Sequence, residues 1–181
     1  MSGGRPAAVF LDRDGTIVQD PAPGFLRDPA GVRLFPGAGA AIARLVRAAL
    51  PVIVVTNQSG IARGFLTWED YHAVARRIDQ LLAAEGGRLA ATYVCPHFPE
   101  VSGRCPCRKP GLAHYHSARD QFGLTLERCC WVGDRISDLE PARALGGTGI
   151  LVRTGNGEGG VEEAVSRVHQ ILECALSSGR G

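Results

Sequence analysis

The sequence predicts an α/β fold: a doubly wound, Rossmann-like parallel sheet. Two observations support this prediction. Short apolar runs rich in valine and isoleucine alternate with longer stretches of helical period. The apolar runs show no polar alternation, which is typical of parallel strands covered by helices on both faces. A length of 181 residues is close to that of one domain, so we expect residues 1–181 to form a single domain.

The first half of the chain supplies three strands and two helices. Residues 7–11, 51–56 and 91–94 read as strands. Apolar residues at 42, 45, 46 and 49 follow the spacing of an amphipathic helix. Thr67 and Asp70 resemble a capping box that opens a second helix. The buried stripe expected on that helix is Tyr71, Val74, Ile78, Leu81 and Leu82.

The second half continues the alternation after a loop rich in cysteine, proline and glycine. A helix from about 112 to 122 should end at Gly123, because glycine readily adopts the left-handed conformation found after helices. The remaining expected elements are a strand at 129–132, a short helix at 139–145, a strand at 149–152, a glycine-rich loop at 155–160 and an amphipathic helix at 161–175.

Charge and hydropathy exclude several classes of protein. Twenty basic and 18 acidic residues give a net charge of +2, which disfavours electrostatic nucleic-acid binding. The longest apolar run, 48–55, is interrupted by Pro51 and is too short to cross a membrane. The run at 7–11 stops at Asp12, so no secretory signal is visible. We therefore expect a cytoplasmic protein with reduced cysteines and no nucleic-acid or membrane partner. We also expect a monomer, because no surplus apolar segment is evident.

Four aspartates follow two of the expected strands. Asp12 and Asp14 come after the first strand, and Asp134 and Asp138 after the fourth. A D-x-D pair alone is more often a solvated turn. If these two strands are neighbours, however, Asp12 and Asp134 converge at the carboxyl edge of the sheet, where ligands of open α/β sheets bind. Converging carboxylates are the oxygen ligands that Mg²⁺ prefers, with one aspartate available as nucleophile and another as general acid.

Polar and basic residues at the next strand end could bind a phosphate group. Thr56, Asn57, Gln58 and Ser59 offer hydroxyl, amide and backbone donors, although such a segment could also be a plain turn before a helix. Arg108 and Lys109 precede a helix, either as a solvated pair or as cations facing phosphate. Lysine occurs only at position 109, among 19 arginines.

The loop at 95–107 offers a complete set of zinc ligands. Cys95, His97, Cys105 and Cys107 form a Cys₃His set that leaves no open position, which predicts structural rather than catalytic zinc. Because Cys107 is adjacent to Arg108, we hypothesise that zinc fixes the loop so that its two cations point into the site. The other cysteines, Cys129, Cys130 and Cys174, are interpreted as small buried apolar residues.

Taken together, these motifs resemble the haloacid dehalogenase superfamily of phosphatases. Its four motifs occur in order as Asp12-Arg-Asp-Gly-Thr16, Thr56-Asn-Gln-Ser59, Arg108-Lys-Pro110 and Gly133-Asp-Arg-Ile-Ser-Asp138. The segments 10–17, 55–64 and 95–110 are further similar to the heptose-bisphosphate phosphatase branch, to which the histidinol-phosphatase branch is related. The resemblance covers about residues 7–155.

The resemblance implies a covalent mechanism with Mg²⁺. Asp12 would attack phosphorus and Asp14 would act as general acid and then base. The carboxylates of Asp12 and Asp134 and the backbone carbonyl of Asp14 would hold Mg²⁺. Thr56 and Lys109 would hold the phosphoryl oxygens. Asp138 would orient the other site residues from behind them. The expected substrate contacts are Asn57, Gln58, Ser59, Arg108 and Arg135.

The predicted substrate is a small sugar phosphate, since the spacers between motifs leave no room for a large cap domain. We expect removal of the 7-phosphate of a heptose 1,7-bisphosphate. Histidinol phosphate or another small sugar phosphate is the alternative, and a zinc-knuckle nucleic-acid module is a distant one. A non-catalytic relative is disfavoured, because every motif position holds a chemically competent residue. The segment Asp20–Pro23 departs from the His-Gly-Tyr type of loop found in heptose enzymes, and the zinc loop is closer in length to that of the histidinol branch.

Overall fold

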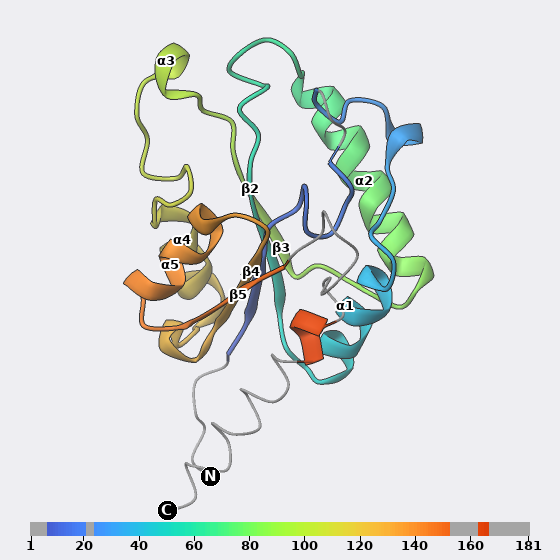
Figure 1. The fold of residues 1–181 in the computed structure, drawn as a ribbon, viewed down its shortest axis with the longest axis vertical. Coiled ribbons are helices and arrows are strands. Elements are labelled where there is room, and N and C mark those ends of the chain that lie inside the picture. The colour runs from blue at the N-terminus through green and yellow to red at the C-terminus, as the bar shows by residue number, and fades with distance from the viewer. Residues whose placement is uncertain (1–6, 21–23, 153–162, 167–181) are drawn as a thin grey trace, which may run out of the picture.

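Five parallel strands form one sheet in the order β3-β2-β1-β4-β5 in the computed structural model, which describes residues 7–20, 24–152 and 163–166 (Figure 1). The strand order reverses direction around β1, as in other doubly wound folds. The predicted fold class is therefore confirmed. The strands are β1 (Val9–Leu11), β2 (Val52–Asn57), β3 (Ala91–Cys95), β4 (Cys130–Gly133) and β5 (Thr148–Leu151).

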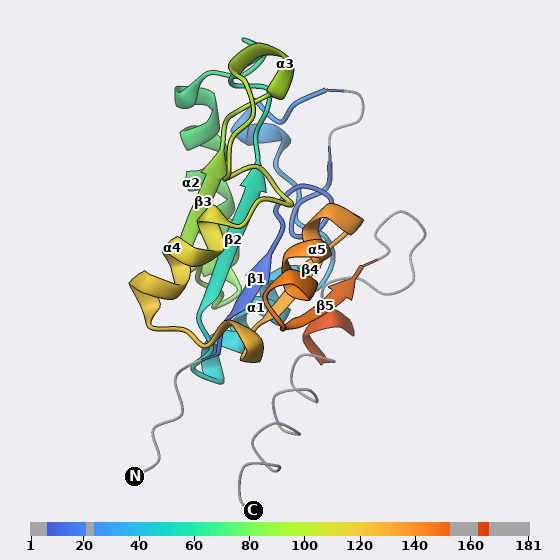
Figure 2. The same ribbon diagram turned by 90° about the vertical axis from the view of Figure 1, so that its left-hand side faces the viewer.

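Helices cover both faces of this sheet. Figures 1 and 2 show α1 and α2 on one side of the strands and α4 and α5 on the other. Shorter helical turns lie in the loops. The helices are α1 (Ala38–Arg47), α2 (Trp68–Ala84), α3 (Pro99–Ser102), α4 (Ala113–Phe122) and α5 (Ile136–Ala144), with the 3₁₀ turns η1 (Pro29–Gly31) and η2 (Leu126–Arg128).

Alternate residues of β1, β2 and β4 enter two separate hydrophobic cores. On β1, Val9 and Leu11 pack in the core beneath α1 and α2, whereas Phe10 packs in the core beneath α4 and α5. In the second core the ring of Phe10 stacks on Trp131, with ring centroids 4.9 Å apart, and meets the edge of Tyr115 at 5.1 Å. Burial on both faces explains why the strands read as uninterrupted apolar runs.

Helix caps confirm several sequence predictions and shift one. The capping box is present: Asp70 N donates to Thr67 Oγ1 and Thr67 N donates to Asp70 Oδ2, both at 3.0 Å. Gly123 ends α4 in the left-handed conformation. The helix predicted at 139–145 instead begins at Ile136, because the Asp138 carboxylate accepts a hydrogen bond from Arg135 N at 3.0 Å and caps an earlier turn.

Other boundaries differ by a few residues. Ala49, predicted on the first helix, lies beyond the end of α1 with a φ of 57°. The glycine-rich loop at 155–160 lies outside the described residues. So does most of the helix predicted at 161–175. Its described part, 163–166, is helical, and Ala164 and Val165 pack in the core beside α1 and α2. Within the described part of the chain, no helix combines the length and apolar character needed to cross a membrane.

Candidate active site

A pocket of about 380 Å³ lies at the carboxyl edge of the sheet. Strand register places its residues there. Leu11 pairs with Val54 on one side and with Val132 on the other, so Asp12 emerges between the ends of β2 and β4. The backbone N–H of Asp12 extends the ladder by donating to Val132 O at 2.9 Å. The pocket is lined by Asp12, Asp14, Asp20, Gly24, Phe25, Leu26, Thr56, Asn57, Gln58, Ser59, Arg108, Lys109, Arg135, Ser137 and Asp138.

Three carboxylates meet at this edge. Asp12, Asp134 and Asp138 each place an oxygen within 4.8 Å of the others. Gly15 makes this approach possible: its φ is +82°, and a Cβ atom there would lie 2.5 Å from Asp134 Oδ2. Asp134 Oδ1 is buried and has no hydrogen-bond partner among the described residues. A buried, unpaired carboxylate oxygen is costly, so this cluster fits a bound divalent cation.

The ammonium group of Lys109 lies within the acidic cluster. Its Nζ is 2.5 Å from Asp12 Oδ1 and 2.8 Å from Asp138 Oδ1, and the residue is 5% exposed. Burial opposes the charge on Lys109, but the two carboxylates outweigh burial and raise its pKa. Burial raises the pKa of Asp12 to about 7, although Lys109 counteracts this shift. Burial and the charge of Asp138 also raise the pKa of Asp134.

Asn57 holds the backbone that carries this lysine. Asn57 Oδ1 accepts a hydrogen bond from Lys109 N at 3.0 Å, and Asn57 Nδ2 donates to Lys109 O at 3.3 Å. The sequence suggested Asn57 as a substrate contact. The structure instead engages both ends of its side-chain amide with the Lys109 backbone.

The Asp14 carboxylate is held by three N–H donors. Arg13 Nε donates to Oδ1 at 2.9 Å and Arg13 Nη2 to Oδ2 at 2.8 Å, while Gln58 Nε2 donates to Oδ2 at 2.7 Å. Gln58 Nε2 also lies 2.9 Å from Thr56 Oγ1. Gln58 was predicted to contact substrate, but its amide nitrogen is committed to Asp14 and Thr56.

Sequence reasoning missed Arg13. The residue is 4% exposed, and its guanidinium lies 5.4 Å from the centroid of the Tyr71 ring on α2. The available signal was its position between two aspartates, because a buried arginine beside a carboxylate usually forms a bidentate pair with it.

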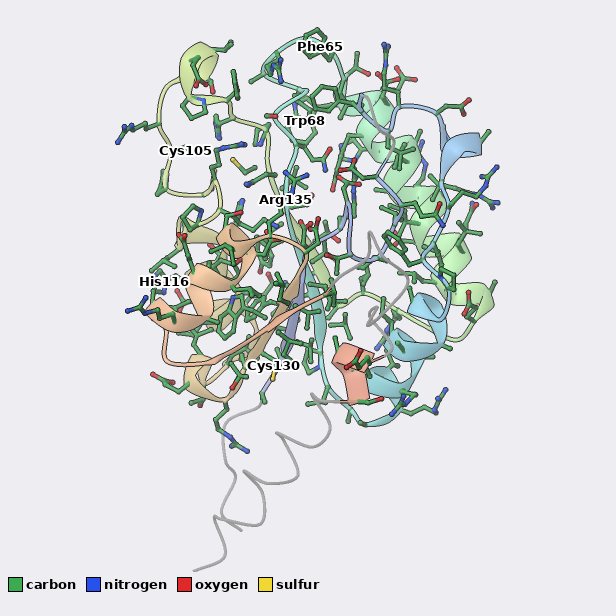
Figure 3. All side chains as sticks on the ribbon, viewed as in Figure 1. Phe65, Trp68, Cys105, His116, Cys130 and Arg135 are labelled. Atoms are coloured by element: carbon green, nitrogen blue, oxygen red, sulfur yellow. The ribbon has the colours of Figure 1, made fainter. Side chains whose placement is uncertain are left out.

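The outer residues of the pocket include two of the predicted substrate contacts. Arg135 is exposed at the rim, and its Nη2 lies 3.5 Å from Asp20 Oδ2. Arg108 donates from Nη1 to the His97 carbonyl at 3.2 Å. Ser59 also lines the pocket, as do Phe25, Leu26 and Ser137, which the sequence did not single out. In the view of Figure 3, Arg135 lies near the middle of the picture.

A second cluster of metal-ligating side chains lies in the loop after β3. The sulfur of Cys105 is 3.6 Å from Cys95 Sγ and 3.4 Å from Cys107 Sγ. His97 Nδ1 lies 3.6 Å from Cys95 Sγ and 3.3 Å from Cys107 Sγ. Four ligands around one zinc ion at ~2.3 Å would be separated by about 3.6 to 3.8 Å, so this set fits tetrahedral zinc.

The remaining described cysteines are far from this cluster. Figure 3 shows Cys105 in the loop beyond α4 and Cys130 toward the opposite end of the sheet. Cys129 and Cys130 are buried in the two cores, as predicted. Cys174 lies outside the described residues.

Comparisons with known proteins agree on one superfamily. The HAD-hydrolase-like family model matches residues 106–173. The chain is 36% identical over 165 residues to the D-glycero-beta-D-manno-heptose-1,7-bisphosphate 7-phosphatase of Pseudomonas putida, covering 91% of this chain and 93% of that protein. It is 37% identical over 160 residues to the protein of the same name from Bordetella bronchiseptica, covering 86% of this chain and 88% of the relative.

Solved structures show the same relationship. A crystal structure of the D,D-heptose 1,7-bisphosphate phosphatase from B. bronchiseptica, complexed with magnesium and phosphate, matches with a TM-score of 0.82 and 33% identity over 91% of this chain and 98% of that chain. A HAD-like phosphatase from Mesorhizobium loti matches with a TM-score of 0.79 and 34% identity over 98% of this chain and 89% of that chain.

Proposed function

Because the chain belongs to the haloacid dehalogenase-like hydrolases, in their heptose-bisphosphate phosphatase family, we propose that it removes the 7-phosphate of D-glycero-D-manno-heptose 1,7-bisphosphate. It is a phosphatase of this family. The observation that best supports the proposal is the buried Asp12 carboxylate at the end of β1, beside Lys109 and at the base of the pocket. A nucleophile in this position faces both an open pocket and a fixed positive charge.

The proposed reaction has two chemical steps. A carboxylate oxygen of Asp12 attacks phosphorus, the bond from phosphorus to the sugar oxygen breaks, and Asp14 gives that oxygen a proton. Asp14 then takes a proton from a water molecule that attacks the aspartyl-phosphate. This step releases inorganic phosphate and regenerates Asp12. Thr56 and the ammonium of Lys109 hold the transferring oxygens, since positioning and charge stabilisation dominate phosphoryl transfer.

We assign the Mg²⁺ ligands to the carboxylates of Asp12 and Asp134 and the backbone carbonyl of Asp14. An all-oxygen set is the kind that Mg²⁺ prefers. Asp134 Oδ1, which has no hydrogen-bond partner in the part of the chain that the structure describes, supports this assignment. When bound, the ion would supply positive charge to the phosphoryl oxygens. Asp138 orients the site by pairing with Lys109.

The loop at 95–107 is proposed to hold structural zinc through Cys95, His97, Cys105 and Cys107. The donor distances and the closed Cys₃His set support this assignment. The loop leads directly to Arg108 and Lys109, so an ordered loop would hold both cations at the pocket.

The outer part of the pocket suits a substrate with a second charged group. Arg108 and Arg135 line it together with Ser59, and we propose these three residues as substrate contacts. Asn57 and Gln58 are the other predicted contacts. Asn57 would act by holding the Lys109 backbone, and Gln58 by holding the Asp14 carboxylate.

We further propose that residues 1–181 act as one domain, as a monomer and in the cytoplasm. The pocket residues surround one edge of a single sheet, which supports one domain. The free thiols of the zinc loop require a reducing compartment. Size-exclusion chromatography with light scattering would test the monomer.

The decisive test is phosphate release by the purified protein with Mg²⁺ and a panel of esters: both anomers of D-glycero-D-manno-heptose 1,7-bisphosphate, histidinol phosphate and other sugar phosphates. The heptose 1,7-bisphosphate should have the highest kcat/KM, and ³¹P NMR should show a heptose 1-phosphate product. Preferential hydrolysis of histidinol phosphate, or loss of the 1-phosphate, would overturn the proposal.

A further inference from the structure

Beside the pocket, three loops that follow three neighbouring strands come together. Phe25 lies in the segment after β1, Arg63 and Phe65 lie in the turn after β2, and Phe98 lies in the loop after β3. In Figure 3 this region, marked by Phe65 and Trp68, lies beyond the carboxyl ends of the strands. The three loops come together around one side chain, that of Arg63.

The guanidinium group of Arg63 contacts three aromatic rings. Its central carbon lies 4.8 Å from the ring centroid of Phe65, 4.8 Å from that of Phe98 and 5.9 Å from that of Phe25. No salt bridge found among the described residues involves Arg63. Arg63 is an exposed residue, and the protein contacts of its guanidinium are aromatic faces, which attract a cation through their quadrupole.

Hydrophobic burial alone does not hold this cluster together. Phe65 is 48% exposed, so much of its ring area remains in contact with water. The cation–π contacts supply attraction at a site where apolar burial is incomplete. They also link segments that no strand pairing connects.

Phe25 is the member of the cluster that reaches the pocket. Its ring stacks on Phe65 at a centroid distance of 5.7 Å and also lines the pocket beside Leu26. The ring lies against the backbone of Gly60, where an added Cβ atom would be 2.7 Å from Phe25 Cδ1. Gly60, Arg63 and Phe65 thus contact Phe25 but do not line the pocket themselves.

Phe98 connects the cluster to the zinc loop. It directly follows the zinc-ligand candidate His97, and the Pro96 carbonyl accepts a hydrogen bond from Ala62 N at 3.2 Å. The turn that carries Arg63 is therefore tied to the zinc loop through both backbone and side chain.

We propose that Arg63 is a positioning residue for substrate specificity: its stack on Phe25, Phe65 and Phe98 fixes the Phe25 ring as the pocket wall that contacts the sugar carbons of the substrate. The proposal rests on the proposed sugar-phosphate activity. It assigns a role to Phe25, which follows the Asp20–Pro23 segment in the sequence.

The test compares a sugar bisphosphate with a phosphate ester too small to reach Phe25. Kinetic constants would be measured for Arg63→Leu with heptose 1,7-bisphosphate, or the best ester of the panel, and with methyl phosphate. KM for the sugar substrate should rise about tenfold, because the wall loses its support, while kcat/KM for methyl phosphate stays within about twofold. Arg63→Lys should recover part of the loss, and Arg76→Leu, an exposed arginine on α2, should change neither substrate.

Equal losses on both substrates would show a merely structural role and overturn the proposal, as would no loss on either. Circular dichroism and zinc content establish that each variant is folded. If the wild-type protein fails to hydrolyse sugar phosphates but cleaves methyl phosphate, the proposed function fails independently of Arg63.

A second set of variants tests whether Arg63 acts through Phe25. Phe25→Ala should raise KM for the sugar substrate to a similar extent, and the double variant with Arg63→Leu should be no worse than either single variant. Gly60→Ala should produce the same selectivity change, since the new methyl group displaces the Phe25 ring without altering any charge. Multiplicative effects in the double variant, or an unaffected Gly60→Ala enzyme, would contradict this route.

Discussion

The acidic cluster and the zinc loop both gather metal-ligating side chains, but different physical forces position them. Asp12 and Asp134 follow β1 and β4 directly, so the hydrogen-bonded register of the sheet fixes where they emerge. In the zinc loop only Cys95 lies on a strand. His97, Cys105 and Cys107 lie along a loop whose one helix, α3, has four residues. The comparison indicates that the sheet preorganises the first site without metal, whereas the second depends on its own ligands.

Lys109 couples these two regions. It follows Cys107 by two positions, yet its ammonium lies within the acidic cluster. The zinc loop thus positions the lysine whose ammonium group lies in the acidic cluster. Any change that loosens the loop should misplace Lys109 while leaving the carboxylates where they are.

The largest expected effect comes from removing the nucleophile. Asp12→Asn should reduce turnover by at least about 10³-fold, because no carboxylate remains to form the phosphoenzyme. Folding should be nearly unchanged, since the strand register and not the charge of Asp12 positions this residue. Steady-state phosphate release and thermal unfolding would measure the two properties.

The matched control is Asp120→Asn, an exposed aspartate on α4 that pairs with Arg119. Its activity should equal that of the wild type. Substantial turnover by Asp12→Asn, with trapped phosphoenzyme on another residue, would refute the covalent role of Asp12.

Loosening the zinc loop tests the other half of the comparison. Cys107→Ser should lose zinc and lower kcat/KM by about 10²-fold, because a shift of about 1 Å in Lys109 is enough to disturb phosphoryl positioning. Mg²⁺ binding should be largely retained, since strand ends hold Asp12 and Asp134. Metal analysis, calorimetry and kinetics would separate these effects.

Cys130→Ala provides the control for this experiment, because Cys130 is buried in the core on β4 and lies outside the Cys₃His set. It should keep one zinc ion per chain. A Cys107→Ser enzyme that lacks zinc but remains fully active would mean that the loop directs Lys109 without metal.

The sequence predicted the parts of the site that depend on strand ends. Uninterrupted apolar runs identified the strands. Asp12 and Asp134 were expected to converge if the first and fourth strands were neighbours, and the pairing of β1 with β4 meets that condition. The Cys₃His set could likewise be recognised from the sequence, because metal ligands occur at characteristic spacings. These features follow from local patterns and from one general rule of sheet geometry.

The sequence could not predict which partner each polar side chain selects. Asn57 and Gln58 were expected to face substrate, but their amides bind the Lys109 backbone and the Asp14 carboxylate. Both choices depend on loops that are distant in the chain and meet only in the folded protein. The aromatic contacts of Arg63 are unpredictable for the same reason, since its three rings come from separate loops.

The affinity of the acidic cluster for Mg²⁺ should depend on pH. Burial raises the pKa of Asp12 to about 7 in the metal-free protein, so its carboxyl group holds a proton at lower pH. Mg²⁺ binds the carboxylate and must displace that proton. The dissociation constant for Mg²⁺ should therefore fall about 20-fold between pH 5.5 and 7.5 and then level off.

Isothermal titration in two buffers of different ionisation enthalpy would measure both the affinity and the proton release. Asp12→Asn should show a flatter pH dependence, although Asp134 also has a raised pKa. An affinity that is constant across this range would show that Lys109 already keeps Asp12 ionised.

The smallest expected effect concerns Gln58, where the sequence and the structure suggest different roles. Gln58→Leu removes the donor to Asp14 and Thr56 and preserves side-chain volume, so kcat should fall about fivefold through the loss of one hydrogen bond to a charged group, with KM nearly unchanged. Gln80→Leu, on the exposed face of α2, should leave both constants unaltered. A raised KM with an unchanged kcat would instead support the original prediction that Gln58 binds substrate. It would also mean that Arg13 alone, through its two bonds to Asp14, suffices to orient the general acid.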